Sequence, residues 1–159
     1  KMISGPMQFR SSVERMEGFV KSVNNFGVAI TSEDVIEGQN TYESGIDCAK
    51  KLLTADVMPT AIFANNDEMA AGVIRVANDL GIAIPQQLSV SGFDDNLYAS
   101  RIIPSLTTIK RPVEEMASYA TNKLIHNINP NHETDEVHSA VKPYLIKRES
   151  TAKCPSSKI

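Results

Sequence analysis

Short apolar runs alternate along this chain with longer segments whose apolar residues recur at helical spacing. Runs with strand character begin near Val35, Ile62 and Ser89, at equal intervals along the sequence. Each run is short and apolar, as strands covered on both faces are. Helical stripes fill the intervals, first at Tyr42, Ile46, Ala49 and Leu53, then at Ala70, Val73, Ala77 and Leu80. This alternation predicts an α/β fold with a doubly wound parallel sheet.

The first part of the chain predicts one more strand and one more helix. Met2 and Ile3 have the character of a strand end, which Gly5 and Pro6 close. Residues 11–14 have the spacing of a capping box at a helix start. The predicted helix has an apolar face and ends at a glycine, with its stripe at Val13, Met16, Val20 and Val23 and its stop at Gly27.

The chain changes character after Asp95. The connector 96–105 is more apolar than a loop needs, and residues 106–109 have strand propensity. Pro112 suits the first turn of a helix, whose apolar stripe comprises Val113, Met116, Ala117, Ala120 and Leu124. A polar loop at 127–135 is expected to lead to final strands at 137–141 and 144–146.

Composition narrows the class of protein. The chain has 159 residues, 42% of them hydrophobic and 22% charged, and a formal net charge of -3. This is typical of one soluble domain, and it predicts that these residues do not bind nucleic acid themselves. Cys48 and Cys154 follow no disulfide pattern, which favours a reducing compartment. The sequence shows neither a membrane-length apolar run nor a signal peptide, and its first residue, Lys1, indicates a fragment or a processed chain.

Residues with catalytic or metal-binding potential do not form a known motif. His126, His132 and His138 are spaced by six residues, which does not bring them together as metal ligands on a helix. The serine–lysine spacing at 139–142 precedes Pro143 in an extended segment, and we interpret it as coincidence. We therefore expect no catalytic residues, no metal and no cofactor.

Polar side chains follow several predicted strands. Asn40, Asn66 and Asp67, and Asp94 and Asp95 come after successive strands, while Arg15 lies near a helix start. Open α/β sheets bind ligands at this carboxyl edge, so the set predicts a ring of hydroxyl-binding groups. The alternative is that these residues only cap helices and turns, and the spacing leaves both readings open.

Several motifs of this chain, in their order and spacing, resemble the LacI/GalR family of bacterial transcriptional regulators. The resemblance covers nearly the whole chain and is carried by G-P at 5–6, R-M-E-G-F at 15–19, Y-E-S-G at 42–45, P-T-A-I-F at 59–63, N-D-E-M-A at 66–70, V-S-G-F-D-D at 90–95, P-S-L-T-T-I at 104–109 and L-I-K-R-E-S-T at 145–151.

The resemblance implies a domain organisation. Such regulators join a helix-turn-helix DNA-binding domain to a two-lobed core similar to type I periplasmic sugar-binding proteins. Residues 1–111 would then be the C-terminal lobe, residues 112–130 a helix that crosses to the N-terminal lobe, and residues 131–159 terminal strands and tail. The DNA-binding domain lies outside this chain. A crossover helix without its own sheet should leave its apolar stripe uncovered.

The resemblance also implies a ligand site between the lobes. The family's effector-binding positions correspond to Arg15, Asp94 and, in sugar-responsive members, Asn66. Asn40 stands where the family often has an aromatic ring that stacks on the ligand, and Phe9 is a candidate to replace that ring. Asn66 and Asp94 favour a carbohydrate effector.

The family dimerises through this lobe. The corresponding positions are Ala70 and Ile74, on what we expect to be the outer face of the helix that Asp67 is predicted to cap, and Ile102 and Ile103 in the connector. The alternative is that Ile102 and Ile103 cover the core of their own lobe.

These observations predict the effector-sensing region of a cytoplasmic, homodimeric regulator that controls operator binding allosterically. The runner-up is a periplasmic-type solute-binding protein that serves a transporter. An enzyme is a distant third, and no membrane contact is expected.

Overall fold

The computed structural model describes residues 1–129 and 141–154. Five strands of its sheet are parallel, in the order β2-β1-β3-β4-β5, and β6 closes the β5 edge in the antiparallel direction. The strands are β1 (Met2–Ser4), β2 (Val35–Glu37), β3 (Ala61–Ala64), β4 (Ser89–Asp94), β5 (Thr107–Lys110) and β6 (Tyr144–Ile146). The predicted α/β architecture is confirmed, although the antiparallel β6 makes the sheet mostly rather than wholly parallel.

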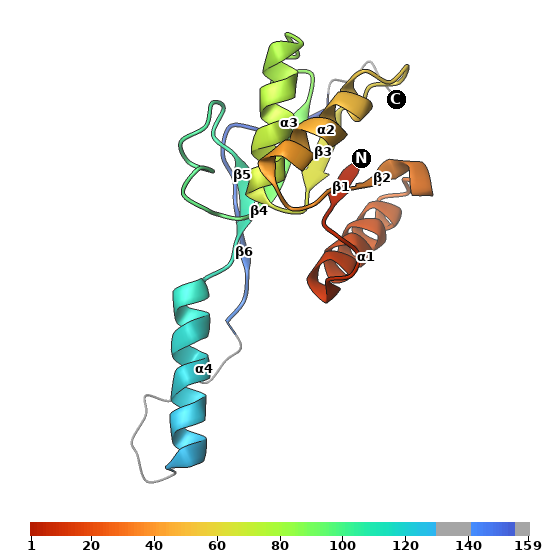
Figure 1. Ribbon diagram of the computed structural model, residues 1–159. Helices are drawn as coiled ribbons and strands as arrows, with labels where there is room; N and C mark the ends of the chain where they lie inside the picture. The colour runs from red at the N-terminus through yellow and green to blue at the C-terminus, as the bar shows by residue number, and fades with distance from the viewer. Residues whose placement is uncertain (130–140, 155–159) are drawn as a thin grey trace.

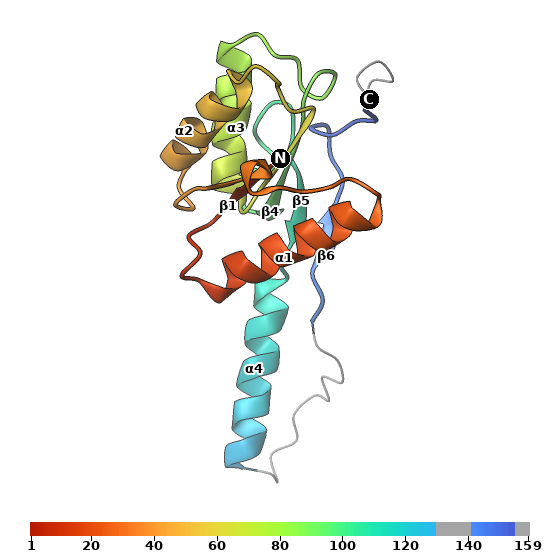
Figure 2. The same cartoon turned by 90° about the vertical axis from the view of Figure 1, so that its right-hand side faces the viewer.

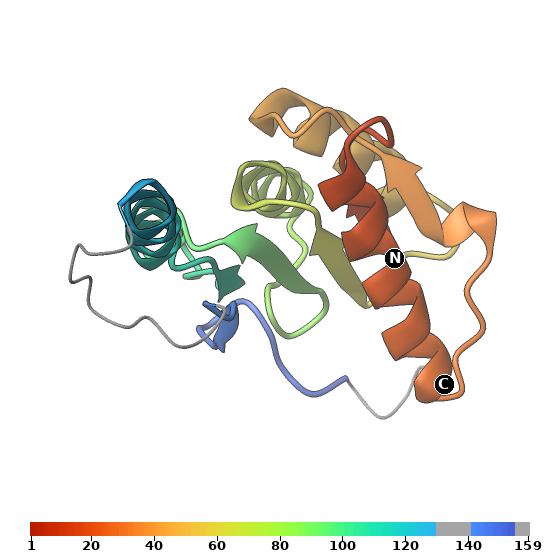
Figure 3. The same ribbon diagram turned by 90° about the horizontal axis from the view of Figure 1, so that it is seen from below.

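Helices cover both faces of the sheet. Helix α2 (Tyr42–Leu53) and helix α3 (Asp67–Asp79) lie on one face, and α1 (Arg10–Asn25) lies on the other (Figure 3). A short 3-10 helix, η1 (Ser32–Asp34), leads into β2. The core fills the α2/α3 side, with Ile62, Val73 and Val90 among its buried residues. Gly45 and Gly72 let α2 and α3 approach closely, because a Cβ atom at either glycine would meet the backbone of the other helix within 3 Å.

Helix α4 (Val113–Ile128) projects from the lobe instead of packing on the sheet (Figures 1 and 2). Its residues are all described, and none of them is buried. The apolar stripe is therefore uncovered in this chain, as the sequence predicts. Two apolar side chains, Val113 and Leu124, are 56% and 59% exposed.

Two predicted helix starts are wrong in detail. Helix α1 begins at Arg10 after Phe9, with no side-chain cap, so residues 11–14 form no capping box. Glu14 pairs instead with Arg10 one turn earlier, at 2.7 Å. Helix α3 is capped by Asn66 rather than Asp67, because the Asn66 side chain accepts a hydrogen bond from the Met69 N–H.

Two predictions for the last part of the chain also change. Helix α4 extends through Asn127 and Ile128, where a polar loop was expected. Val141 is not in a strand, and the rest of the expected strand at 137–141 lies outside the described residues. His132, His138 and the serine of the 139–142 motif lie outside them as well.

Candidate functional site

The parallel strands β1, β3, β4 and β5 deliver polar residues to one edge of the sheet. Asn65 and Asn66 follow β3, Asp94 and Asp95 stand at the end of β4, and Arg111 follows β5. The register pairs Asp94 with Lys110, which puts Arg111 next to the end of β4. The carboxyl edge of such a sheet is where open α/β folds bind ligands.

Arg15, Asp94 and Arg111 form the cluster that we call the outer cluster. Arg111 Nε lies 2.8 Å and Arg15 Nη2 3.9 Å from the same Asp94 oxygen, Oδ1. The side chain of Arg111 is 41% exposed, that of Arg15 is 16% exposed and that of Asp94 is 26% exposed. This cluster brings together two of the predicted effector-binding residues, Arg15 and Asp94, and adds Arg111, which the sequence analysis missed.

Arg15 and Asp94 of the outer cluster are constrained, the first by its side-chain contacts and the second by its backbone conformation. Arg15 donates a hydrogen bond from Nη1 to the Asn65 carbonyl at 2.7 Å, and its guanidinium lies 3.9 Å from the centre of the Phe93 ring. Asp94 has a φ of 119°, which an L-residue with a side chain rarely adopts. Such strain persists where surrounding contacts enforce it, and it is concentrated at functional sites.

Burial and the attraction between opposite charges shift the pKa values of Asp94 and Arg15 in opposite directions. Burial raises the pKa of Asp94, and the positive charges of Arg111 and Arg15 act against that rise. Burial also lowers the pKa of Arg15, with Asp94 opposing the change and Arg111 adding to it by repulsion. The two arginines therefore repel each other across one carboxylate.

A second group, the inner cluster, comprises Asp67, Thr108, Asp95 and Arg148. Asp67 is 1% exposed, and its two oxygens accept from the Thr108 hydroxyl at 2.5 Å and the Asn96 N–H at 2.8 Å. The Asp95 carboxylate is 9% exposed and contacts Arg148 Nη2 at 2.6 Å and Lys110 Nζ at 3.4 Å. These contacts tie α3, β4, β5 and the C-terminal segment together.

Asn40, Asn65 and Asn66 form a third polar group around Gly5. The Asn65 amide donates to Asn40 Oδ1 at 2.8 Å, and the Asn66 amide donates to the Asn40 carbonyl at 2.9 Å. A Cβ atom on Gly5 would collide with Asn40, Asn65 and Ser12, so only glycine fits there. Two of the candidate residues, Asn40 and Asn66, are thus in contact, and the Asn66 side chain also caps α3.

Phe9 remains half-exposed at the N-cap of α1, with 51% of its surface accessible. Arg15 lies in the second turn of this helix, because α1 begins at Arg10. Its positive charge is therefore not opposed by the helix dipole, because that effect is confined to the first turn.

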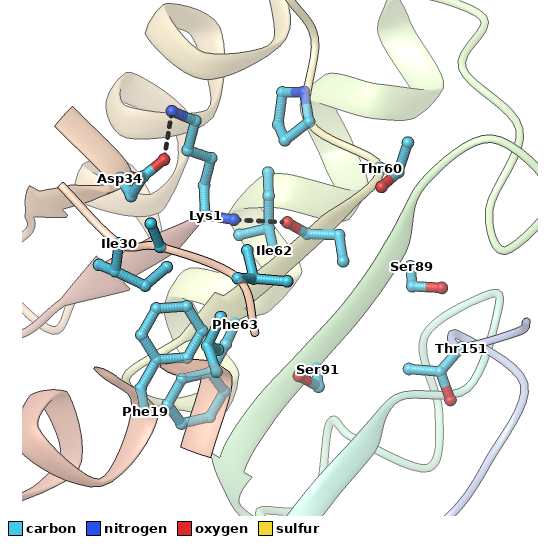
Figure 4. Close-up of a pocket in the computed structure, with 15 residues that line it drawn as sticks. Lys1, Phe19, Ile30, Asp34, Thr60, Ile62, Phe63, Ser89, Ser91 and Thr151 are labelled. Atoms are coloured by element: carbon cyan, nitrogen blue, oxygen red, sulfur yellow. Dashed lines mark hydrogen bonds and ion pairs between the residues drawn. The ribbon is translucent and has the colours of Figure 1, made fainter. Parts of the chain in front are cut away.

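A hollow of about 740 Å³ lies between α1 and the sheet, beside the outer cluster. Its lining combines aromatic rings with donors, including Phe63, Phe93, Ser91, Arg15 and Arg111. A second hollow of about 590 Å³ lies on the same face and shares Phe19 and Phe63 with the first. Figure 4 shows the second hollow with the Phe19 and Phe63 rings together at one end and the Lys1–Asp34 ion pair at another. Only the first hollow contains a residue predicted to bind the effector, Arg15.

The residues expected at a dimer interface fall into two classes. Ala70 and Ile74 are 0% and 4% exposed inside the lobe's own core, so their placement on an outer face of α3 is wrong. The reason is that both residues lie on the buried side of α3, whose exposed face carries Arg75, Asn78 and Asp79. Ile102 packs partly against the same core, whereas Ile103 is 85% exposed.

The described residues, 1–129 and 141–154, contain no group of three or more metal-ligating side chains. Within the same ranges, none of the helices combines the length and apolar character that crossing a membrane requires. Cys48 is buried and Cys154 is exposed.

A family model described as a periplasmic binding protein-like domain matches residues 2–151. The chain is 35% identical over 150 residues to the HTH-type transcriptional repressor PurR of Pasteurella multocida, covering 94% of this chain and 44% of the relative. It is 36% identical over 128 residues to the probable HTH-type transcriptional repressor ExuR of Bacillus subtilis, covering 80% and 38%. The chain therefore spans less than half the length of these relatives, which are repressors rather than enzymes.

Solved structures of transcriptional regulators are also similar to this chain. A sugar-binding transcriptional regulator of the LacI family from Escherichia coli, complexed with phosphate, superposes with a TM-score of 0.86 at 30% identity, over 94% of this chain and 53% of that one. The transcriptional regulator CelR in complex with cellobiose gives 0.79 at 30% identity, over 94% and 45%. Together with the family match, these likenesses show that the chain belongs to the periplasmic binding protein-like family, as the effector-binding region of a LacI/GalR-type regulator.

Proposed function

We propose that this chain senses a small polar metabolite for a DNA-binding transcriptional regulator. The observation that carries the proposal is the outer cluster, where Arg15 and Asp94 meet at the carboxyl edge of the sheet with side chains 16% and 26% exposed. Partly exposed charged groups beside a hollow of about 740 Å³ are suited to bind hydroxyls. Asn66 and Asn40 extend this polar surface along the edge. A carbohydrate fits such a lining, and the CelR neighbour is a complex with cellobiose.

The effector would act by changing the arrangement of two lobes. Helix α4 follows Arg111 and Pro112 and projects from the lobe (Figure 1). Its apolar stripe is uncovered in this chain. We infer that it packs on an N-terminal lobe that lies outside this chain. An effector that contacts both lobes would favour one arrangement, and this shift in population would reach the DNA-binding domains.

The proposal is tested in the full-length regulator that contains this chain. Asp94→Ala should abolish the response to effector while specific operator binding persists, since each lost charge-assisted hydrogen bond costs about 1.5–3 kcal/mol of effector affinity. Electrophoretic mobility shift with and without effector measures both. Normal induction of the variant would refute the role of Asp94. Absence of specific DNA binding by the full chain would instead favour the solute-binding alternative.

We also propose that the connector 96–105 carries a homodimer interface. Leu97, Tyr98 and Ile103 are 63%, 58% and 85% exposed, which is unusual for three large apolar residues in one loop. The lac repressor neighbour, at a TM-score of 0.85 and 26% identity over 97% of this chain, is described as dimeric. Ile103→Asp should shift the full-length protein toward monomer in sedimentation velocity, and an unchanged dimer would remove Ile103 from the interface.

A further inference from the structure

We propose that Arg111 and Arg15 together form an anion subsite, so that the effector is a polyhydroxylated molecule with a carboxylate or phosphate group. The inference rests on the proposed effector-binding function and adds the chemical class of the ligand. The experiment below separates failure of the subsite from failure of the function.

The first observation is an excess of positive charge. Two guanidinium groups converge on one carboxylate oxygen, at 2.8 Å from Arg111 and 3.9 Å from Arg15. One negative charge neutralises only one of the two positive ones. The position of Asp94 Oδ1 also shows that an anionic oxygen fits between these guanidiniums.

The neighbouring acidic residues are already engaged elsewhere. Asp95 pairs with Arg148 at 2.6 Å and with Lys110 at 3.4 Å. Asp67 is held by Thr108 and the Asn96 N–H, and Glu14 by Arg10 at 2.7 Å. The excess charge of the outer cluster is therefore left for solvent or for a ligand.

The two arginines differ in how firmly they are held. Arg15 is fixed by the Asn65 carbonyl and by the face of the Phe93 ring. Arg111 is 41% exposed, and among residues 1–129 and 141–154 its side chain forms one ion pair, with Asp94. A guanidinium offers paired N–H donors that match a carboxylate or a phosphate. Arg111 can thus turn from Asp94 toward an incoming anion, while Arg15 holds its place.

The surroundings favour an oxygen-rich ligand. Both arginines line the hollow of about 740 Å³, together with the hydroxyl-bearing residues Ser11, Ser22 and Ser91. Hydroxyl and guanidinium groups supply the donors that an anionic polyol requires. The hollow therefore offers donors for anionic and hydroxyl groups next to the aromatic rings of Phe63 and Phe93.

Isothermal titration calorimetry on the full-length regulator tests the subsite. D-galacturonate and D-galactose differ in carrying a carboxylate or a neutral hydroxymethyl group, and inorganic phosphate serves as a competitor. We expect galacturonate to bind at least about tenfold more tightly than galactose, because one charge-assisted contact is gained. Competition by phosphate would show that the subsite accepts phosphate groups, and lack of competition would restrict it to carboxylates.

Arg111→Gln is the informative variant, and Lys110→Gln is its matched control. Lys110 is the adjacent cation, but it pairs with Asp95 in the inner cluster. Arg111→Gln should remove the preference for galacturonate, whereas Lys110→Gln should keep it. Equal binding of the two sugars, binding of neither anion, or a preference that survives Arg111→Gln would each overturn the anion subsite. Specific DNA binding of the same samples is measured separately, so the regulator function can stand even if the subsite fails.

Discussion

Asp94 and Asp95 are adjacent in the sequence, yet they belong to regions of the sheet edge that are built differently. In the inner cluster, Asp95 is 9% exposed and Asp67 is 1% exposed, and their oxygens contact donors from three parts of the chain: β5, the connector after β4 and the C-terminal segment. In the outer cluster, Asp94 is 26% exposed and lies between two arginines. Its single negative charge cannot neutralise both of their positive charges. The inner carboxylates hold strands together, and the outer one remains available to a ligand.

This difference shows how a rigid frame can support a responsive site. The inner cluster fixes the ends of β4 and β5 through buried hydrogen bonds and ion pairs, which are costly to break. Because the backbone at Asp94 continues from that fixed end, its strained φ of 119° can be maintained. Substitutions should therefore affect stability in the inner cluster and ligand binding in the outer cluster.

The largest loss of stability is expected for Asp67→Ala. It would leave the Asn96 N–H and the Thr108 hydroxyl without their acceptor in a buried site. The free energy of unfolding should fall by about 3 kcal/mol. Glu68→Ala, at the next position in α3, should change it by less than about 0.5 kcal/mol. Chemical denaturation measures both, and equal effects of the two variants would contradict the special role of Asp67.

A smaller loss is expected for Asp95→Asn. The amide keeps the shape of the side chain and tolerates the left-handed φ of 55°. It removes the charge that faces Arg148 and Lys110. The free energy of unfolding should fall by about 1–2 kcal/mol, because Arg148 retains its hydrogen bond to the Leu106 carbonyl. A neutral effect would mean that this ion pair does not hold the C-terminal segment.

The sequence predicted the strands and helices well because the central strands pack against α2 and α3, which bury the core on that face of the sheet. Ile62 and Val90 are buried, so their runs are apolar. The direction of β6 was not predictable from its own residues, since Tyr144 and Leu145 are 50% and 60% exposed. Its antiparallel pairing with β5 depends on the path by which the chain returns from α4.

The candidate site was only partly predictable. Arg15 and Asp94 follow from the family motifs, but Arg111 depends on the register of two strands, which pairs Asp94 with Lys110. Choosing between Asn66 and Asp67 as the cap of α3 was also beyond the sequence, because both are good N-cap residues and they are adjacent. The burial of Ile74 could have been foreseen, since the polar residues Arg75, Asn78 and Asp79 mark another face of α3 as the exposed one.

Asp94→Asn should have a much smaller effect on stability than either inner variant. Burial already disfavours the charged form of Asp94, as its raised pKa shows, and the side chain is 26% exposed. We expect a change of less than about 1 kcal/mol in the free energy of unfolding. Effector affinity should nevertheless fall. A loss as large as that of Asp67→Ala would show that the outer cluster is part of the structural frame.

The smallest expected effect is a pH dependence of the free energy of unfolding. Its sign distinguishes a carboxylate whose pKa is raised by burial from one whose pKa is lowered by hydrogen bonds. Burial raises the pKa of Asp67 above its ordinary value of 3.8, so the folded protein binds this proton more tightly than the unfolded chain does. The free energy of unfolding should therefore fall as pH rises from 3.8 through the raised pKa of Asp67. Subtracting the curve of Asp67→Asn isolates this contribution. Asp94→Asn should give a difference curve of the same sign, because burial is also the main cause of its raised pKa.

Glu149 provides a carboxylate whose contribution has the opposite sign. The Ser105 backbone and side chain donate hydrogen bonds that lower its pKa. Its stabilising contribution is present above the ordinary value of 4.5 and is lost as pH falls through the lowered pKa. The difference curve of Glu149→Gln should thus slope against those of Asp67→Asn and Asp94→Asn. If Asp94 followed Glu149 instead, the two arginines would outweigh burial, and burial would not be the main influence on the pKa of Asp94.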